Sequence, residues 1–236
     1  MLLTNQVAIV TGAGRGLGRA VALALAEHGA SVVLASRNAP ELDEVVKEVR
    51  RAGGRALAQT ADVADERQVQ ELVLAAEEWV GPATIVVNCA GMVGPIGPLA
   101  LSDPAAWLRS LAVNVGGVYL LSRAVLPGML DRGYGRIVNL SSGAATRSRV
   151  GRTSYAAAKA AIDQLTRTLG FELEGTGVAV CAFDPGIIEP AVPALPGRPA
   201  SALAITYLAS PAASPNGSVL AMGDDDLAQA VTAALG

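Results

Sequence analysis

Short apolar runs alternate with longer amphipathic segments along most of the chain. The apolar runs predict strands at 6–11, 31–35, 55–60, 84–88, 134–140, 177–183 and 217–221. The segments between them predict helices at 16–28, 40–52, 65–79, 103–129, 152–174, 199–209 and 224–235. Near-continuous apolar strands, each followed by a helix, predict an α/β fold. We expect a doubly wound parallel sheet of about seven strands with helices on both faces.

Length and charge narrow the class of protein. The chain has 236 residues, of which 51% are hydrophobic, with no internal repeat or low-complexity linker, so we expect a single domain over residues 1–236. A net charge of −3 offers no basic surface for nucleic acid. Two uncharged stretches, 80–102 and 199–223, are interrupted by prolines and glycines, so we expect no membrane span.

Cysteine usage and the N-terminal sequence bear on the compartment. Cys89 and Cys181 lie in or at the end of predicted strands, so we expect buried reduced thiols rather than a disulfide. The N-terminus lacks a positive segment followed by an apolar one, which a secretion signal would have. A cytoplasmic protein is expected.

The first predicted strand leads directly into a glycine-rich turn. The sequence from Thr11 to Gly18 reads TGAGRGLG, a helical pattern follows it, and a second strand comes next. Glycines let the backbone approach a pyrophosphate closely, while the helix N-terminus offers free N–H groups and a positive dipole end. This order predicts a dinucleotide site, with Gly12, Arg15, Gly16, Leu17 and Gly18 as binding residues.

Tyr155 and Lys159 are the strongest catalytic candidates. They are four residues apart in the predicted helix 152–174, so they share one face, and Ser142 precedes Tyr155 by thirteen residues. A cation held beside a phenol favours the phenolate, which suits an acid/base catalyst. An isolated pair with this spacing is more often an exposed tyrosine and a solvated lysine. The glycine turn at the other end of the chain favours the catalytic interpretation.

Taken together, these motifs resemble the short-chain dehydrogenase/reductase family in its compact single-domain form, which has a Rossmann-type fold. The resemblance runs from about Val7 to Gly186. Cys89 replaces the second asparagine of the family's Asn-Asn-Ala-Gly motif, which we take as harmless because the backbone does most of that motif's work. By resemblance the family's functional residues fall on Thr11, Gly12, Gly16 and Gly18 of the glycine motif, Asp62 and Val63 beside the adenine, Asn88, Ala90 and Gly91 after the fourth strand, Asn114, Ser142, Tyr155 and Lys159 of the catalytic tetrad, and Pro185, Gly186 and Ile188 beside the nicotinamide.

The resemblance also implies a role for each member of the tetrad. Tyr155 would exchange a proton with a carbonyl or alcohol oxygen, and Ser142 would hydrogen-bond the same oxygen. Lys159 would also bind the ribose hydroxyls of the nicotinamide. Asn114 would anchor a water that links the lysine to solvent, although from the sequence alone a surface or capping asparagine is an equal reading.

The end of the second predicted strand indicates the coenzyme. An NAD enzyme places a carboxylate about 20 residues past the glycine motif, where it accepts hydrogen bonds from the ribose 2′-hydroxyl. Here Ser36, Arg37 and Asn38 occupy this place, and Asp43 is too far into the next helix. Arg37 and Arg15 can instead bind a 2′-phosphate. We therefore expect NADP(H), with Ser36 and Arg37 in its site.

The segment after Gly186 departs most from the family. Pro190 replaces the usual threonine that holds the nicotinamide carboxamide, and four prolines between residues 187 and 199 deny a continuous helix. We expect a shortened, extended substrate lid around 187–199, or a lid supplied by the C-terminal helix. Either arrangement suits a bulky or carrier-held substrate.

Other residues point away from metal chemistry. His28 precedes Gly29 at a predicted helix end, and the acidic run 224–226 precedes the last helix, so both are read as helix-terminal residues and no metal site is expected. The apolar and small-residue faces of helices 103–129 and 152–174 predict a homodimer or homotetramer. Two alternatives to an NADP(H)-dependent carbonyl/alcohol oxidoreductase stay open: an NAD-linked alcohol dehydrogenase, and a catalytically silent dinucleotide-binding regulatory or structural subunit.

Overall fold

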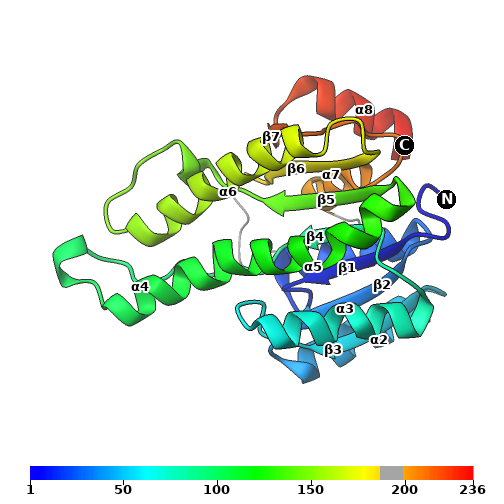
Figure 1. Cartoon of the computed structure of the whole chain (residues 1–236), viewed down its shortest axis with the longest axis horizontal. Helices are drawn as coiled ribbons and strands as arrows, with labels where there is room; N and C mark the ends of the chain where they lie inside the picture. The colour runs from blue at the N-terminus through cyan, green and yellow to red at the C-terminus, as the bar shows by residue number, and fades with distance from the viewer. Residues whose placement is uncertain (187–198, 236) are drawn as a thin grey trace.

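Seven parallel strands form one sheet in the computed structural model, which describes residues 1–186 and 199–235 (Figure 1). The strand order is β3-β2-β1-β4-β5-β6-β7, and every pair of neighbours is parallel. The strands are β1 (Val7–Thr11), β2 (Ser31–Ser36), β3 (Arg55–Thr60), β4 (Ile85–Asn88), β5 (Gly135–Leu140), β6 (Val178–Asp184) and β7 (Val219–Ala221).

Every helix predicted from the sequence is present, with ends that differ by only a few residues. The α-helices are α1 (Gly16–Glu27), α2 (Ala39–Arg51), α3 (Glu66–Val80), α4 (Pro104–Leu111), α5 (Gly117–Arg132), α6 (Thr153–Glu172), α7 (Ala200–Leu208) and α8 (Asp225–Leu235). Short 3₁₀ turns, η1 (Leu99–Leu101) and η3 (Gly143–Ala145), precede α4 and α6. The predicted doubly wound parallel sheet is confirmed.

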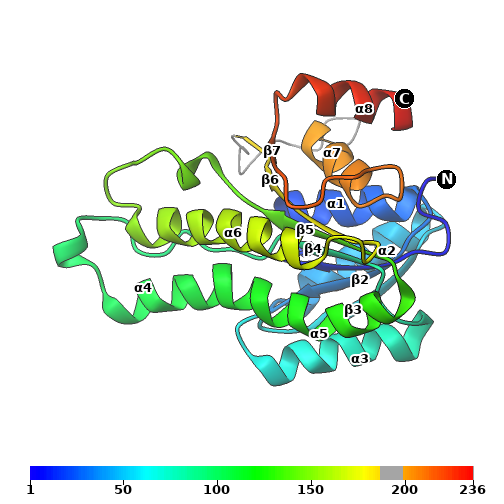
Figure 2. The same cartoon turned by 45° about the horizontal axis from the view of Figure 1, so that its top comes forward.

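The two faces of the sheet carry separate cores because side chains alternate along each strand. Figure 2 shows the helices on both sides of the sheet. Val10 and Val87 face the layer formed by α1, α2 and α7, and α8 packs on the outside of α7. Ile9 and Val86 face the layer formed by α3, α5 and α6. Both faces are therefore buried, as the apolar strand sequences predict.

The helix predicted at 103–129 is interrupted. A π-helical segment, η2 (Ala112–Gly116), joins α4 to α5 and holds Asn114. Such single-turn widenings occur frequently at functional sites. Together Pro104–Arg132 is the one run of the described residues that is long and apolar enough to span a membrane. Leu121 and Met129 of this run lie in the core between the sheet and the layer of α3, α5 and α6. The run therefore packs as a core helix does.

The strand order reverses between β1 and β4, and this fixes where a ligand can bind. Chain crossovers run in one direction from β1 through β2 to β3, and in the other from β4 onward. In open α/β sheets the ligand crevice lies outside the carboxyl ends of the strands at such a reversal. The turns after β1, β4, β5 and β6 all lie at this edge.

Candidate active site

A cleft of about 580 Å³ opens at the carboxyl ends of β1, β2 and β4. It brings together segments that the sequence placed in one dinucleotide site. The lining residues are Gly12, Gly14, Arg15, Gly16, Leu17, Gly18, Ser36, Arg37, Asn38, Glu41, Ala61, Asp62, Val63, Cys89, Ala90, Gly91, Met92 and Val113.

The glycine turn forms the floor of the cleft as bare backbone. Gly12 and Gly16 have φ angles of 65° and 55°, which side chains rarely adopt, and α1 begins at Gly16. A Cβ on Gly18 would lie 2.3 Å from the Gly12 carbonyl oxygen, so α1 packs tightly on the turn. Since the first turn of α1 carries no acidic residue, its N–H groups and dipole can serve an anion. A pyrophosphate fits this cradle.

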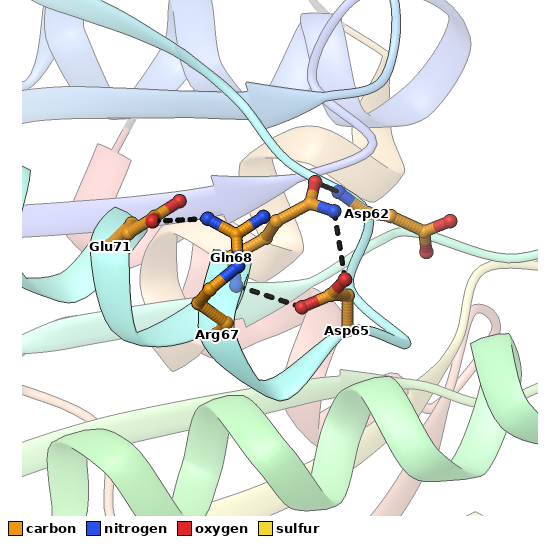
Figure 3. Close-up of polar contacts among 5 residues, drawn as sticks. All are labelled: Asp62, Asp65, Arg67, Gln68 and Glu71. Carbon is orange, nitrogen blue, oxygen red and sulfur yellow. Dashed lines mark hydrogen bonds and ion pairs between the residues drawn. The ribbon is translucent and has the colours of Figure 1, made fainter.

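Asp62 lies at one side of the cleft, at the start of the turn that leads into α3. Its backbone N–H donates to Gln68 Oε1 at 2.9 Å, and Gln68 in turn bonds Asp65, the N-cap of α3 (Figure 3). These contacts fix the backbone and leave the Asp62 carboxylate directed away from them (Figure 3). That carboxylate forms an ion pair with Arg109 of α4 and accepts the Ala64 N–H at 3.0 Å. Arg109 is a contact that the sequence did not reveal.

The end of β2 places charges of both signs in the cleft. Arg15 and Arg37 line it, as predicted, together with Ser36, whose Oγ accepts the Asn38 N–H at 3.1 Å. Glu41, in the first turn of α2, also lines it: a Cβ on Gly14 would lie 2.8 Å from Glu41 Oε2. Glu41 lies neither at the strand end nor at position 43, so the sequence did not indicate it.

Asn88 has a different position from the one the motif suggests. It is 3% exposed and does not line the cleft, since its Nδ2 donates to Asn139 Oδ1 at 2.9 Å. Asn139 Nδ2 donates to Thr166 Oγ1 at 3.0 Å, so the pair ties β4 and β5 to α6. Cys89 and Ala90 reach the cleft, and the Ala90 N–H donates to Thr11 Oγ1 at 3.1 Å. Asn88 acts here by fixing the strand ends.

Ser142 and Tyr155 line a second, smaller cavity of about 160 Å³ beyond β5. Ser142 follows β5 as the N-cap of η3, and its Oγ accepts the Ala144 N–H at 3.2 Å. Tyr155 is half-buried in the first turn of α6. Gly186 also lines this cavity, and Asp184 at the end of β6 accepts the Gly186 N–H at 3.0 Å. Ser142, Tyr155 and Gly186 thus line one cavity.

Lys159 lies one turn further along α6, behind Tyr155. Its Nζ is 5.5 Å from the centroid of the Tyr155 ring and donates to the Leu140 carbonyl oxygen at 2.5 Å. Lys159 is only 6% exposed, and this burial lowers its pKa to about 8, against the opposing effects of Cys89, Asp163 and Asp184. The predicted shared face of the two residues is thus present.

The neighbours of Lys159 explain how a buried ammonium is tolerated. Asp163 is also buried and accepts a hydrogen bond from Ser141 Oγ at 2.5 Å. Cys89 is partly exposed to the cleft, not buried as predicted, but desolvation still raises its pKa to about 12, so it remains a neutral thiol. The carboxylates of Asp163 and Asp184 therefore supply the negative charge near Lys159.

Asn114 is neither a surface nor a capping residue, because it is 1% exposed within η2. Its Nδ2 donates to the carbonyl oxygens of Met92, at 2.7 Å, and Ser110, at 2.9 Å. Its Oδ1 accepts the Met92 N–H at 3.3 Å. The side chain therefore pins the backbone after β4 to the widened helix.

Several residues that line the two cavities belong to no sequence motif, so the sequence did not predict them. They are Met92 and Val113 in the nucleotide cleft, and Arg147, Arg149 and Arg152 beside Tyr155. Ile188, Pro190 and the shortened lid lie outside the described residues, except for Pro199, which is the N-cap of α7.

Comparison with known proteins places this site in a family. A family model described as short chain dehydrogenase matches residues 6–194. A short chain dehydrogenase of Pseudocercospora fijiensis is 40% identical over 189 residues, which is 79% of this chain and 61% of that protein. The chain thus spans less than two thirds of that relative's length. The short-chain reductase protein NovJ of Streptomyces niveus is 43% identical over 184 residues, 78% of this chain and 70% of that protein.

Two solved structures of similar proteins support the same family assignment. A short-chain type dehydrogenase/reductase from Mycobacterium ulcerans superposes with a TM-score of 0.87 at 29% identity, covering 94% of this chain and 90% of that one. A 7 alpha-hydroxysteroid dehydrogenase, solved with NADH and 7-oxo glycochenodeoxycholic acid, gives a TM-score of 0.86 at 33% identity and covers 93% of each chain. By family match, sequence identity and fold alike, the chain belongs to the short-chain dehydrogenase/reductase family.

Proposed function

We propose that the protein is an NADP(H)-dependent oxidoreductase for a carbonyl/alcohol pair, with Tyr155 as the acid/base. The observation that carries this proposal is the arrangement of Tyr155, half-buried on a cavity wall with Ser142, over the buried Lys159. Such a Tyr–Lys pair beside a dinucleotide cleft serves proton exchange at a substrate oxygen. The nicotinamide, when bound, supplies or accepts the hydride at the substrate carbon.

The protein's own side chains exchange a proton and form hydrogen bonds with the carbonyl or alcohol oxygen of the substrate. In reduction, Tyr155 Oη donates its proton to the carbonyl oxygen, and in oxidation it takes the proton from the alcohol. Ser142 Oγ already accepts the Ala144 N–H, so its own O–H is free to donate to the same oxygen. Lys159, fixed by the Leu140 carbonyl, keeps a positive charge close to the Tyr155 ring. By family resemblance it also binds the nicotinamide ribose.

Arg15 and Arg37 support NADP(H) over NAD(H), because both line the cleft where a 2′-phosphate would extend from the adenosine ribose. Glu41 favours the alternative, an NAD-linked enzyme, since its carboxylate lies at the same corner and could accept hydrogen bonds from a 2′-hydroxyl. We favour NADP(H) because Arg15 and Arg37 contribute two positive charges to this part of the cleft, whereas Glu41 contributes one negative charge.

The substrate class is a small-molecule or carrier-held carbonyl or alcohol compound. The relatives include a hydroxysteroid dehydrogenase solved with a 7-oxo steroid acid, which supports a cavity open to large rings. A homodimer or homotetramer is part of the proposal, since α4, α5 and α6 each expose a large apolar side chain.

The test is a panel of ketones, quinones and thioesters of keto acids, assayed with NADPH and NADH by nicotinamide absorbance. We expect turnover with NADPH and a higher specificity constant than with NADH. Tyr155→Phe is expected to bind nucleotide normally and to lose at least about 10²-fold in kcat, the usual contribution of a general acid. Failure of every carbonyl, with nucleotide bound, would favour the silent binding subunit instead.

A further inference from the structure

The cavity beside Tyr155 carries a concentration of positive charge that the proposed hydride transfer does not use. Three of its lining residues are Arg147, Arg149 and Arg152, all from the connection between η3 and α6. Figure 1 shows this connection extending beyond the carboxyl edge of the sheet, before α6. The chain between β5 and α6 therefore carries both the catalytic candidate Ser142 and the three guanidinium groups.

These arginines have no counter-ion within residues 1–186 and 199–235. None of the ion pairs in this part of the chain includes them. Arg147 Nε lies 3.5 Å from the Gly143 carbonyl oxygen, a long contact. Asp184 is the one carboxylate among the lining residues, and it already accepts the Gly186 N–H. The cavity thus has three cations against one acid.

Helix stability does not account for this arrangement. Arg152 is the N-cap of α6, where the positive end of the helix dipole disfavours a cation, and the first turn of α6 holds no acidic residue. Gathering like charges around one small cavity also costs free energy through repulsion. A local cost of this kind is offset when an anion binds.

The position of Arg147 ties the charge closely to the reacting centre. A Cβ on Gly143 would lie 1.9 Å from Arg147 Nη2, so the guanidinium covers the residue next to Ser142. A small side chain at position 143 would displace it. Gly143 therefore leaves room for a guanidinium in the cavity that Ser142 also lines.

We propose that the substrate of this enzyme carries an anionic group, a carboxylate or a phosphate, which Arg147, Arg149 and Arg152 bind while the carbonyl lies at Ser142 and Tyr155. The inference rests on the proposed function and names its substrate class. Guanidinium groups match carboxylate and phosphate oxygens with paired hydrogen bonds. The anion can belong to a short keto acid, or to the phosphates of a coenzyme A thioester.

Two matched pairs of probes separate these sources. The first pair is a β-keto acid and its methyl ester, which differ only in the carboxylate. The second is a β-ketoacyl coenzyme A and the N-acetylcysteamine thioester of the same acyl group, which lacks the phosphates. For each pair, the ratio of kcat/KM for the anionic over the neutral member reports the contribution of charge.

In the wild-type enzyme we expect one ratio to exceed about ten, and to fall as added salt screens the charges. In the triple variant R147Q/R149Q/R152Q that ratio is expected to fall about tenfold, from a loss of about 0.2–1 kcal/mol for each exposed pair. Should the triple variant fail to fold, the single variants are each expected to lower the ratio about two- to threefold. Arg167→Gln, an exposed arginine further along α6, is the matched control and is expected to leave the ratio unchanged.

Calorimetric binding of the same probes, with oxidised coenzyme present, makes the test independent of turnover. Arginine-dependent binding of an anionic probe in this experiment, together with no turnover of any probe in the NADPH assay, would uphold the anion site and refute the proposed oxidoreductase. Turnover of the neutral probes with ratios near one in both pairs, or ratios that the arginine variants leave unchanged, would overturn this inference and leave the proposed function standing.

Discussion

The buried Lys159 affects both the stability of the fold and the proposed chemistry at Tyr155. It shares one face of α6 with Tyr155 because four residues make about one helical turn, and that much follows from sequence spacing. Its burial and its bond to the Leu140 carbonyl depend on β5 and the surrounding core. Spacing alone could not have revealed either.

Replacing Lys159 tests how much the burial of its charge lowers the free energy of unfolding. Its pKa falls from 10.5 to about 8 on folding, so below pH 8 the folded protein must hold a buried charge. This cost is full below pH 8 and disappears as pH rises to 10.5, because between those values the unfolded chain binds more protons. Relative to wild type, the free energy of unfolding of Lys159→Met is therefore expected to be about 3 kcal/mol higher at pH 7 than at pH 10.5, on top of a constant cost from losing the bond to the Leu140 carbonyl.

Denaturant unfolding at the two pH values measures this difference. The chain's other lysine, Lys47, is exposed on α2, so Lys47→Met is the control and is expected to change stability little at either pH. A stability difference between Lys159→Met and wild type that is the same at pH 7 and pH 10.5 would contradict the assigned burial cost.

Asn114 offers a second test at the residue scale. Asn114→Ala removes a hydrogen-bond partner of the partly buried Met92 N–H and of the carbonyls of Met92 and Ser110. Leaving such groups unpaired costs about 1–3 kcal/mol, which denaturant unfolding can measure. Retained stability in Asn114→Ala would mean that these groups find other partners and that the side chain does not hold the turn after β4.

At the scale of elements, the strands were the most predictable part of the chain. Residues 7–10 of β1 and 85–87 of β4 are apolar throughout because both faces of the sheet are covered. The π-helical turn η2 was not predicted, because its register depends on packing and on the contacts of Asn114. Glu41 was missed for a similar reason, since only the direction of α2 brings its side chain to the cleft.

We propose that the turn between β2 and α2 selects the coenzyme. Arg37→Asp is expected to narrow or reverse the preference for NADPH over NADH, because it replaces a cation that can bind the 2′-phosphate with a repelling carboxylate. Glu41→Gln is expected to do the opposite and strengthen the preference. Dissociation constants for both nucleotides, from nicotinamide fluorescence, report the change.

Wild-type protein that binds NADH as well as NADPH would contradict the assignment and favour the Glu41 alternative. Arg55, which stacks on Trp79 away from this turn, supplies a control: Arg55→Gln is expected to leave the ratio of the two constants unchanged.

At the scale of the whole molecule, the catalytic candidates come from distant parts of the sequence. Ser142 and Tyr155 share one cavity wall with Gly186, while the nucleotide cleft joins the turns after β1, β2 and β4. The order of motifs predicted this convergence, since all lie after carboxyl ends of parallel strands. The arginine cluster was not predicted, because no periodicity marks a loop that faces a cavity.

Assembly is also a property of the whole molecule. Leu108, Tyr119 and Phe171 are 60%, 53% and 75% exposed on α4, α5 and α6, which lie on the same side of the sheet. Light scattering at micromolar concentration is expected to give a dimer or tetramer, weakened by Phe171→Glu. Lys47→Glu, on the opposite layer, is the control. A monomeric wild-type protein would refute the proposed assembly.

The measurement that tests the account most directly is transfer of deuterium from NADPH labelled at the hydride-bearing carbon to a carbonyl substrate. Wild-type enzyme is expected to place the label on the product's alcohol carbon. Tyr155→Phe is expected to bind the nucleotide with unchanged affinity and to transfer label at least about 10²-fold more slowly. Label transfer by Tyr155→Phe at a rate within a few-fold of wild type would contradict the central claim.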